Sequence, residues 1–432
     1  MSLKRIVVIV LSLALAGGAV FATLHSLNSR AAEATYKTPE ESDPYVRFGM
    51  EAYDKIRENY WASTTEEQVA DHFQLSLQKA LNSPVVPLLA TRNRVGTAEM
   101  LKTAIDAATS TAAKKQMVVD TLIIALYNLQ PVGHGQLLSA VQETELRQGV
   151  SNIHPEKNLY QDLGLAAGAS AEDVNKAAEE KQKVLAAEAK TSSEARKELE
   201  QVSYAKEVLA NPNTKDLYDA GGIEPTVKSK AVGKTLYVSI SSISPTTFIE
   251  FGRTILSATT TPGLSSMIID LRGNLGGSLD FAAAFVGLFI GENQYAYDLY
   301  HQGEYKPQRT TAPKFAELGR YKEIAILTDG ASQSTAEVTT AAMKRLGLAH
   351  SVGETTRGWG TVENTFPIET VIDPSERYSM LLVHSLTLRD DNQPVESNGV
   401  VPDVSIKDPN WKSELSTYFR STDLIAAVKS VF

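Results

Sequence analysis

The C-terminal half of the chain alternates short apolar segments with amphipathic ones, and this alternation constrains the fold more than any other feature. Three stretches have the apolar spacing of a helix, and they are Thr247–Ser257, Leu279–Ile290 and Thr335–Leu346. The strand-like segments around them are Thr235–Ile243, Met267–Leu271, Ile324–Leu327 and Met380–Thr387. Strands that alternate with helices through right-handed crossovers predict an α/β domain.

Composition narrows the class of protein. The chain has 432 residues, which at roughly 100–200 residues per domain allows two to four domains. Its net charge of −9 argues against nucleic acid as a partner, because a nucleic-acid-binding domain carries a basic excess. The sequence contains no cysteine, which excludes thiolate nucleophiles, disulfides and cysteine-ligated metals. We expect no cofactor and no metal.

Residues 1–34 have the pattern of a targeting segment. Lys4 and Arg5 precede an apolar run, Ile6–Ala22. Basic residues before such a run favour a cytoplasmic N-terminus and an exported remainder. We therefore expect a single-pass protein of a bacterial cytoplasmic membrane with its bulk in the periplasm or another extracytoplasmic space. A cleaved signal peptide stays open beside the uncleaved anchor, because Ala32-Glu33-Ala34 has the small-x-small pattern of a cleavage site.

The next region, residues 35–150, reads as helical after a polar linker at 35–44. Met117–Leu129 repeats apolar residues at three- and four-residue spacing, and the segment 131–135 (PVGHG) then breaks the pattern. Residues 135–150 read as helical again. At the other end of the chain, 409–432 predicts a C-terminal helix that starts at 411.

Residues 151–225 form a charged helical block that resembles a J-domain. The resemblance rests on the segment 158–165 (NLYQDLGL), on Ser170 as the start of a helix and on 204–219 (YAKEVLANPNTKDLYD). A J-domain stimulates its Hsp70 partner through a His-Pro-Asp turn. The corresponding segment, Ala186–Ser192, lacks that triplet. The resemblance therefore implies an all-α docking or spacing module with a protein partner other than Hsp70.

Two turns between a strand and a helix carry candidate chemistry. The first, Asp270–Gly277 (DLRGNLGG), ends in glycines that can present backbone N–H groups to an anion. The second, Thr328–Glu337 (TDGASQSTAE), contains Ser332 and Ser334. A serine at such a turn can act as a nucleophile, and it can equally cap the helix.

Together with 353–361 (GETTRGWGT) and 396–403 (ESNGVVPD), these turns are similar to motifs of the C-terminal processing (tail-specific) and tricorn-like serine peptidases. The resemblance implies a crotonase-like (ClpP/crotonase-type) core over residues 230–408, with Ser334 as nucleophile. It implies an oxyanion hole formed by the backbone N–H groups of Thr335 and of the Gly276-Gly277 turn. Glu337 and Thr356 would support the site.

The catalytic base is where the sequence departs from these relatives. The tail-specific branch pairs serine with a lysine, and this chain has Trp359 there, with Glu363 in place of the glutamine that supports the lysine. The tricorn-like branch uses a histidine before the core and a glutamate near its end. Those positions correspond to His134 and Glu396, with Glu396 orienting the histidine or stabilising its charged form.

Three hypotheses therefore stay open. The first is a membrane-anchored serine endopeptidase that cleaves exported polypeptides with the triad Ser334, His134 and Glu396. The second is a catalytically inactive peptidase fold that binds peptides or acts as a scaffold. The third is an enzyme with another base, for which His384 is the candidate.

Overall fold

A computed structural model describes residues 36–82 and 88–432. The expected targeting segment, 1–34, lies outside the described residues. Within these ranges no helix has the length and apolar character needed to cross a membrane. The described residues divide into two compact units, which are 36–58 with 64–82, 88–129 and 367–377, and 59–63 with 130–366 and 378–432.

The first unit is helical. After a short 3₁₀ turn (η1, Pro39–Ser42), its helices are α2 (Pro44–Asn59), α3 (Glu66–Ala80), α4 (Arg94–Ala107) and α5 (Thr111–Tyr127). Thr65 and Gln68 form a reciprocal capping box that starts α3. The expected helix at Met117–Leu129 is α5. It starts earlier because Ser110 caps it, accepting a hydrogen bond from the N–H of Ala113.

The second unit is built on a six-stranded sheet with the order β11-β8-β7-β4-β3-β2. The strands are β2 (Val227–Val232), β3 (Thr235–Ile240), β4 (Ser266–Asp270), β7 (Glu323–Thr328), β8 (His350–Gly353) and β11 (Val404–Ser405). Every neighbouring pair is parallel except β2 with β3. The predicted strands at 235, 267 and 324 are β3, β4 and β7, and the mixed α/β class is confirmed.

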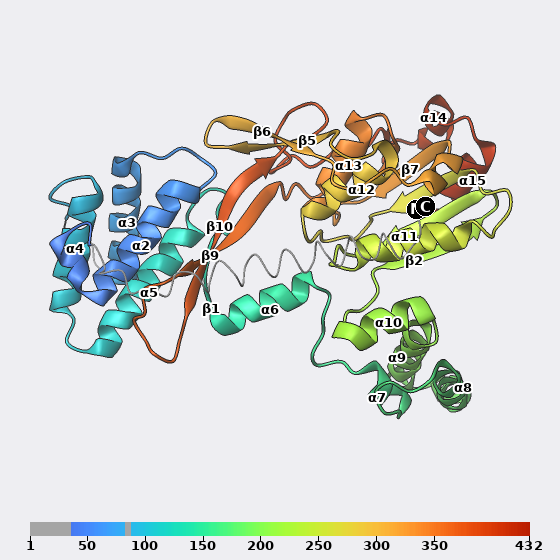
Figure 1. Cartoon of the computed structure of the whole chain (residues 1–432), viewed down its shortest axis with the longest axis horizontal. Helices are drawn as coiled ribbons and strands as arrows, with labels where there is room; N and C mark the ends of the chain where they lie inside the picture. The colour runs from blue at the N-terminus through green and yellow to red at the C-terminus, as the bar shows by residue number, and fades with distance from the viewer. Residues whose placement is uncertain (1–35, 83–87) are drawn as a thin grey trace. The chain divides into compact units, whose positions relative to one another are not determined.

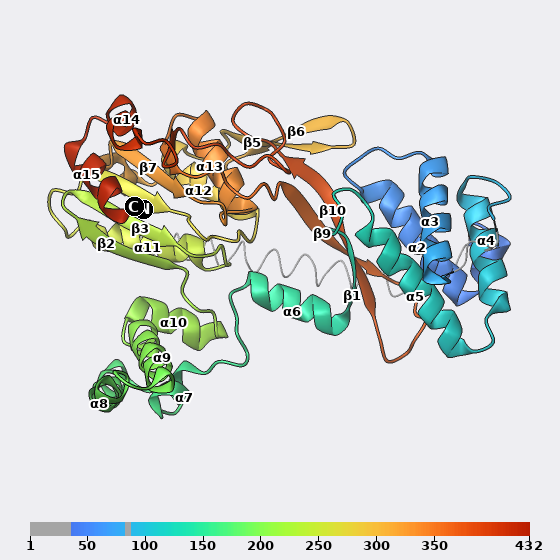
Figure 2. The same cartoon turned by 180° about the vertical axis from the view of Figure 1, so that it is seen from behind.

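Helices cover both faces of this sheet. One face packs against α11 (Thr247–Ala258), α12 (Asp280–Ile290) and α13 (Thr335–Arg345). The other packs against α14 (Trp411–Tyr418) and α15 (Thr422–Val431), and Figure 2 shows α15 beside β3. The side chains of β4 alternate between the two cores, with Met267 and Ile269 on one side and Ile268 on the other. Such alternation follows from the two-residue period of a strand.

The expected single C-terminal helix is two helices, α14 and α15. The carboxylate of Glu323 accepts hydrogen bonds from the N–H groups of Arg420 and Ser421, and this holds the break between them. Ser421 then caps α15 by accepting from the N–H of Leu424. A periodic apolar pattern alone does not reveal such an interruption.

A second sheet has the order β1-β10-β5-β6, with β9 paired to β10. Its strands are β1 (Gln136–Ser139), β5 (Tyr295–His301), β6 (Glu304–Arg309), β9 (Thr361–Ile368) and β10 (Tyr378–Thr387). The prediction that residues 135–150 are helical throughout is wrong. Residues Gln136–Ser139 pair antiparallel with β10 and bury Leu137 and Leu138, and α6 (Ala140–Val150) starts only afterwards.

The helical block contains α7 (Leu159–Leu163), α8 (Ala171–Glu188), α9 (Ser193–Leu209) and α10 (Pro212–Gly221), which Figure 1 shows in green. The helices share a small apolar core. It buries Leu159, Tyr160, Leu163, Val208 and Leu209 among others, and Tyr218 packs against it half-buried. The block begins and ends at one point, because Ile153 and Ile223 form an antiparallel bridge and the Asn152 side chain donates to the carbonyl oxygen of Glu224.

Candidate active site

Ser334 lies at the turn from β7 into α13. Asp329 organises this turn, because one carboxylate oxygen accepts the N–H groups of Ala331 and Ser332 and also that of Gly273 from the neighbouring turn. Burial would raise the pKa of Asp329, but these hydrogen bonds outweigh it and hold that pKa below its ordinary value. The carboxylate therefore ties the serine turn to the turn that follows β4.

The two serines of the turn have different environments. Ser332 is fully buried, and its hydroxyl donates to the carbonyl oxygen of Leu271 at 2.8 Å. Ser334 is half-buried and adopts φ +56° and ψ −125°, a strained backbone conformation for a residue with a side chain. Strain of this kind is common at functional sites. Ser332 is a structural residue, and Ser334 is the candidate nucleophile.

The glycine turn after β4 packs directly against Ser334. A Cβ atom on Gly276 would lie 2.7 Å from the Cβ of Ser334, so only glycine permits this approach. The Gly276 N–H donates to the Asn274 side chain at 2.8 Å, so it is committed within its own turn. In the described part of the chain, no hydrogen bond uses the N–H of Gly277 or of Thr335. These two donors remain open for an oxyanion.

Glu337 connects the start of α13 to the segment that follows β8. Its buried carboxylate accepts the N–H of Ser334 at 2.9 Å, of Gly358 at 2.7 Å and of Trp359 at 2.9 Å. It also accepts the hydroxyl of Thr356, whose oxygen accepts the N–H of Val400 at 2.7 Å. Burial raises the pKa of Glu337, and the four hydrogen bonds oppose that rise. Glu337 and Thr356 thus fix the backbone around Ser334.

His134 follows the end of α5 and precedes β1, and its side chain is 9% exposed. Its Nδ1 lies 2.8 Å from Thr361 Oγ1 and 3.3 Å from Glu363 Oε1, and its ring stacks on the indole of Trp359 with centroids 4.0 Å apart. The structure describes both His134 and Ser334, and no hydrogen bond joins them. Catalytic hydrogen bonds are often long in proteins without substrate, so the triad stays a prediction.

Glu396 lies near Nε2 of His134, whereas Thr361 and Glu363 lie near Nδ1. Its Oε1 lies 3.8 Å from His134 Nε2, and its Oε2 accepts the N–H of Gly360 at 2.9 Å. His384, the alternative base, lies on β10, where its ring stacks on His301 at 4.2 Å and its Nδ1 pairs with the hydroxyl of Ser385. Burial and the neighbouring His301 lower the pKa of His384.

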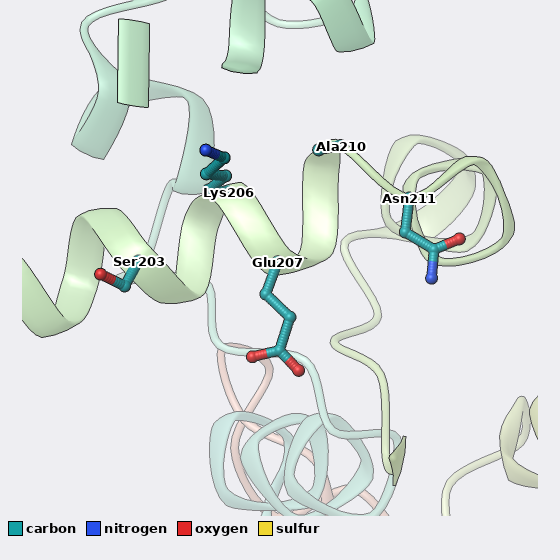
Figure 3. Close-up of a pocket in the computed structure, with 5 residues that line it drawn as sticks. All are labelled: Ser203, Lys206, Glu207, Ala210 and Asn211. Atoms are coloured by element: carbon teal, nitrogen blue, oxygen red, sulfur yellow. The ribbon is translucent and has the colours of Figure 1, made fainter. Parts of the chain in front are cut away.

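Two shallow hollows lie on the helical block, away from these residues in the sequence. The first is lined by Ser203, Lys206, Glu207, Ala210 and Asn211, and Figure 3 shows the Lys206 and Glu207 side chains on different sides of α9. The second is lined by Glu180, Lys181, Val184, Leu185 and Glu198. Neither includes a residue of the candidate site.

The sequence motifs thus converge in the structure. The turn at 273–277 adjoins Ser334, and the 356–360 segment adjoins Glu337. His134 adjoins Glu396. The sequence did not predict that Thr361, Trp359 and Glu363 contact His134. A signal for these contacts was present, because Trp359 and Glu363 replace the lysine and the glutamine of the tail-specific branch within one short segment.

A serine that opens a helix after a parallel strand, beside uncommitted backbone N–H groups, is typical of serine hydrolases. Residues 234–406 match the model described as peptidase family S41. This segment is a peptidase family S41 domain.

Curated relatives match over parts of the chain. A protein of Staphylococcus epidermidis named "Probable CtpA-like serine protease" is 30% identical over 151 residues, which cover 35% of this chain and 29% of that protein. A Staphylococcus aureus protein of the same name is 27% identical over 188 residues, which cover 44% of this chain and 36% of that one. The chain spans about a third of the length of these relatives.

Two solved structures are similar at low identity. A photosystem II D1 C-terminal processing protease has a TM-score of 0.47 and 11% identity, over 85% of this chain and 93% of that one. The tricorn protease has a TM-score of 0.39 and 15% identity, over 91% of this chain and 37% of that one.

Proposed function

We propose that the chain is a serine peptidase that hydrolyses polypeptides through an acyl-enzyme on Ser334. One observation carries the proposal: Ser334, the N-cap residue of α13, has a strained backbone conformation and lies next to the uncommitted N–H groups of Thr335 and Gly277. Such donors stabilise the negative charge that develops on the carbonyl oxygen of a peptide bond under attack. The S41 domain over residues 234–406 supports the same chemistry.

In the proposed reaction, Ser334 Oγ attacks the carbonyl carbon while His134 Nε2 takes the hydroxyl proton. His134 then gives that proton to the leaving amine as the C–N bond breaks, and the acyl group stays on Ser334. Water attacks the ester, loses a proton to His134, and the serine oxygen leaves and recovers that proton. Glu396 would stabilise the charged imidazole. No metal or cofactor takes part in these steps.

The finer fold assignments belong to this proposal. Parallel strands β3, β4, β7 and β8, with α11, α12 and α13 between them, support a crotonase-type core. Helices α7 to α10 and their common core support a J-like docking module for a protein partner. The turn between α8 and α9 has no His-Pro-Asp triplet, so we expect no stimulation of Hsp70 ATPase activity.

The cellular location also belongs to the proposal. Lys4, Arg5 and the apolar run Ile6–Ala22 support a bacterial membrane anchor with an exported body and exported polypeptide substrates. A reporter fused to the C-terminus should be active outside the cytoplasm. Activity of that reporter only in the cytoplasm would contradict this part of the proposal.

A fluorophosphonate probe tests the chemistry, because it reacts with an activated serine. The wild-type chain should be labelled, mass spectrometry should place the adduct on Ser334, and Ser334→Ala should remove it. Ser375→Ala, which changes an exposed serine, is the matched control and should keep full labelling. His134→Ala should slow hydrolysis of an unfolded polypeptide by about 10²–10⁴-fold. A folded wild-type chain that neither binds the probe nor hydrolyses polypeptide would contradict peptidase activity and favour the inactive, peptide-binding alternative.

A further inference from the structure

The surroundings of His134 form a closed hydrogen-bonded cluster on one side of its ring. Glu363 Oε1 lies 3.3 Å from His134 Nδ1, and it accepts from the Thr361 hydroxyl and from the Trp359 indole N–H at 3.2 Å. Thr361 Oγ1 lies 2.8 Å from the same Nδ1. His134 Nδ1, Thr361 Oγ1 and Glu363 Oε1 therefore lie within hydrogen-bonding distance of one another.

The directions of these hydrogen bonds determine where the proton of His134 lies. A carboxylate has no hydrogen to donate, so Glu363 can only accept. The single hydrogen of the Thr361 hydroxyl points to Glu363, so the Thr361 oxygen can only accept from Nδ1. If Nδ1 carried no hydrogen, the one hydroxyl hydrogen of Thr361 would have to serve both Nδ1 and the Glu363 oxygen, and these two acceptors would face each other without a hydrogen between them. Neutral His134 is therefore protonated at Nδ1.

This assignment leaves the lone pair on Nε2. That nitrogen faces Glu396 Oε1 at 3.8 Å, a distance too long for a hydrogen bond but close enough for a strong charge interaction. Glu396 then attracts Nε2 once it carries a proton, whereas it cannot set the tautomer of the neutral ring. Glu363 therefore acts on the neutral imidazole through Nδ1, and Glu396 acts on the charged imidazole through Nε2.

Trp359 completes the arrangement. Its indole stacks on the His134 ring with an interplanar angle of 26°, and its N–H bonds the same Glu363 oxygen. Its backbone N–H is held by Glu337, which also holds Ser334. The indole therefore fixes the plane of the imidazole relative to the serine turn.

We propose that Glu363, acting through Thr361 and assisted by Trp359, is the positioning residue that holds His134 as an Nδ1–H imidazole with Nε2 free to accept a proton. The inference rests on the proposed function for its catalytic meaning. In this scheme Glu396 stabilises only the charged ring.

Nitrogen-15 NMR of the full-length chain labelled at histidine tests the tautomer without substrate. Spectra are taken at increasing alkaline pH until the His134 signals no longer change, and His134→Ala identifies these signals among the seven histidines. The wild type should show a protonated, pyrrole-like Nδ1 and an unprotonated Nε2. A wild type protonated at Nε2 would overturn the inference, and this holds whether or not the chain hydrolyses any peptide.

Two variants test the role of Glu363. Glu363→Met removes the acceptor at similar length, so the Thr361 hydroxyl becomes free to donate to Nδ1 and the tautomer should change. Glu363→Gln keeps an acceptor oxygen and should retain the wild-type tautomer. For hydrolysis, Glu363→Met should lower kcat by on the order of 10²–10⁴-fold with KM little changed, and Glu363→Gln should recover most of that loss. An unchanged tautomer and an unchanged kcat in Glu363→Met would overturn the positioning role.

Discussion

Replacement of Gly276 by alanine adds one methyl group at the closest approach of the two turns of the site. That methyl group would lie 2.7 Å from the Cβ of Ser334, 2.9 Å from the carbonyl oxygen of Gln333 and 3.0 Å from the N atom of Thr335. The backbone φ of +84° costs an alanine about 1–2 kcal/mol, and relief of the overlap costs about 1–3 kcal/mol more. We expect Gly276→Ala to lower the free energy of unfolding by about 2–5 kcal/mol.

Gly273→Ala is the matched control in the same turn. Gly273 has a φ of +70°, but no heavy atom lies within 4 Å of an added methyl group, so only the backbone cost of about 1–2 kcal/mol applies. Urea unfolding of both full-length variants measures the difference. Fluorophosphonate labelling should slow on the order of 10²-fold in Gly276→Ala alone, because the methyl group displaces Ser334 from the oxyanion donors. Equal stability losses, or wild-type labelling of Gly276→Ala, would refute the geometric argument.

Three other changes test separate parts of the fold. Glu337→Gln leaves at least one backbone N–H without an acceptor, and urea unfolding should show a loss of about 1–3 kcal/mol. The pKa of Asp329 is lower in the folded chain than its ordinary value of 3.8, so its ionised carboxylate stabilises the fold at pH values above 3.8. As the pH falls below 3.8, the wild type should lose stability relative to Asp329→Asn. Urea unfolding between neutral pH and about pH 3 measures this loss. Tyr204→Phe removes a hydrogen bond to buried Glu224, and thermal unfolding should show a loss of about 1–3 kcal/mol; an unchanged melt would contradict it.

Local patterns carried most of what the sequence revealed about the site. The segment containing Ser334 is a strand, a turn and a helix within a few residues of each other, so its apolar run and its turn residues predict the arrangement without knowledge of the rest of the chain. The same holds for β4 and the glycines that follow it. Caps such as Ser110 are equally local, and they explain why α5 begins where it does.

Contacts between distant segments were beyond sequence reasoning. Strand β1 has only four residues, and it is a strand because it pairs with β10 more than two hundred residues later. The contact between His134 and Thr361 joins residues 227 positions apart. A motif comparison gives the residue types at positions 359 and 363. Only the fold reveals that Trp359 and Glu363 contact His134 where the tail-specific relatives have a lysine and a glutamine.

The bridge between Ile153 and Ile223 has a consequence for how such a protein can evolve. Because the two ends of the helical block meet at this bridge, the length and shape of the block place no demand on the spacing of the strands on either side. A gene segment can be gained, lost or exchanged there in one event without a change in the register of β1 or β2. The helical block can therefore be exchanged by recombination while the sequence of the sheet and its helices stays under separate selection.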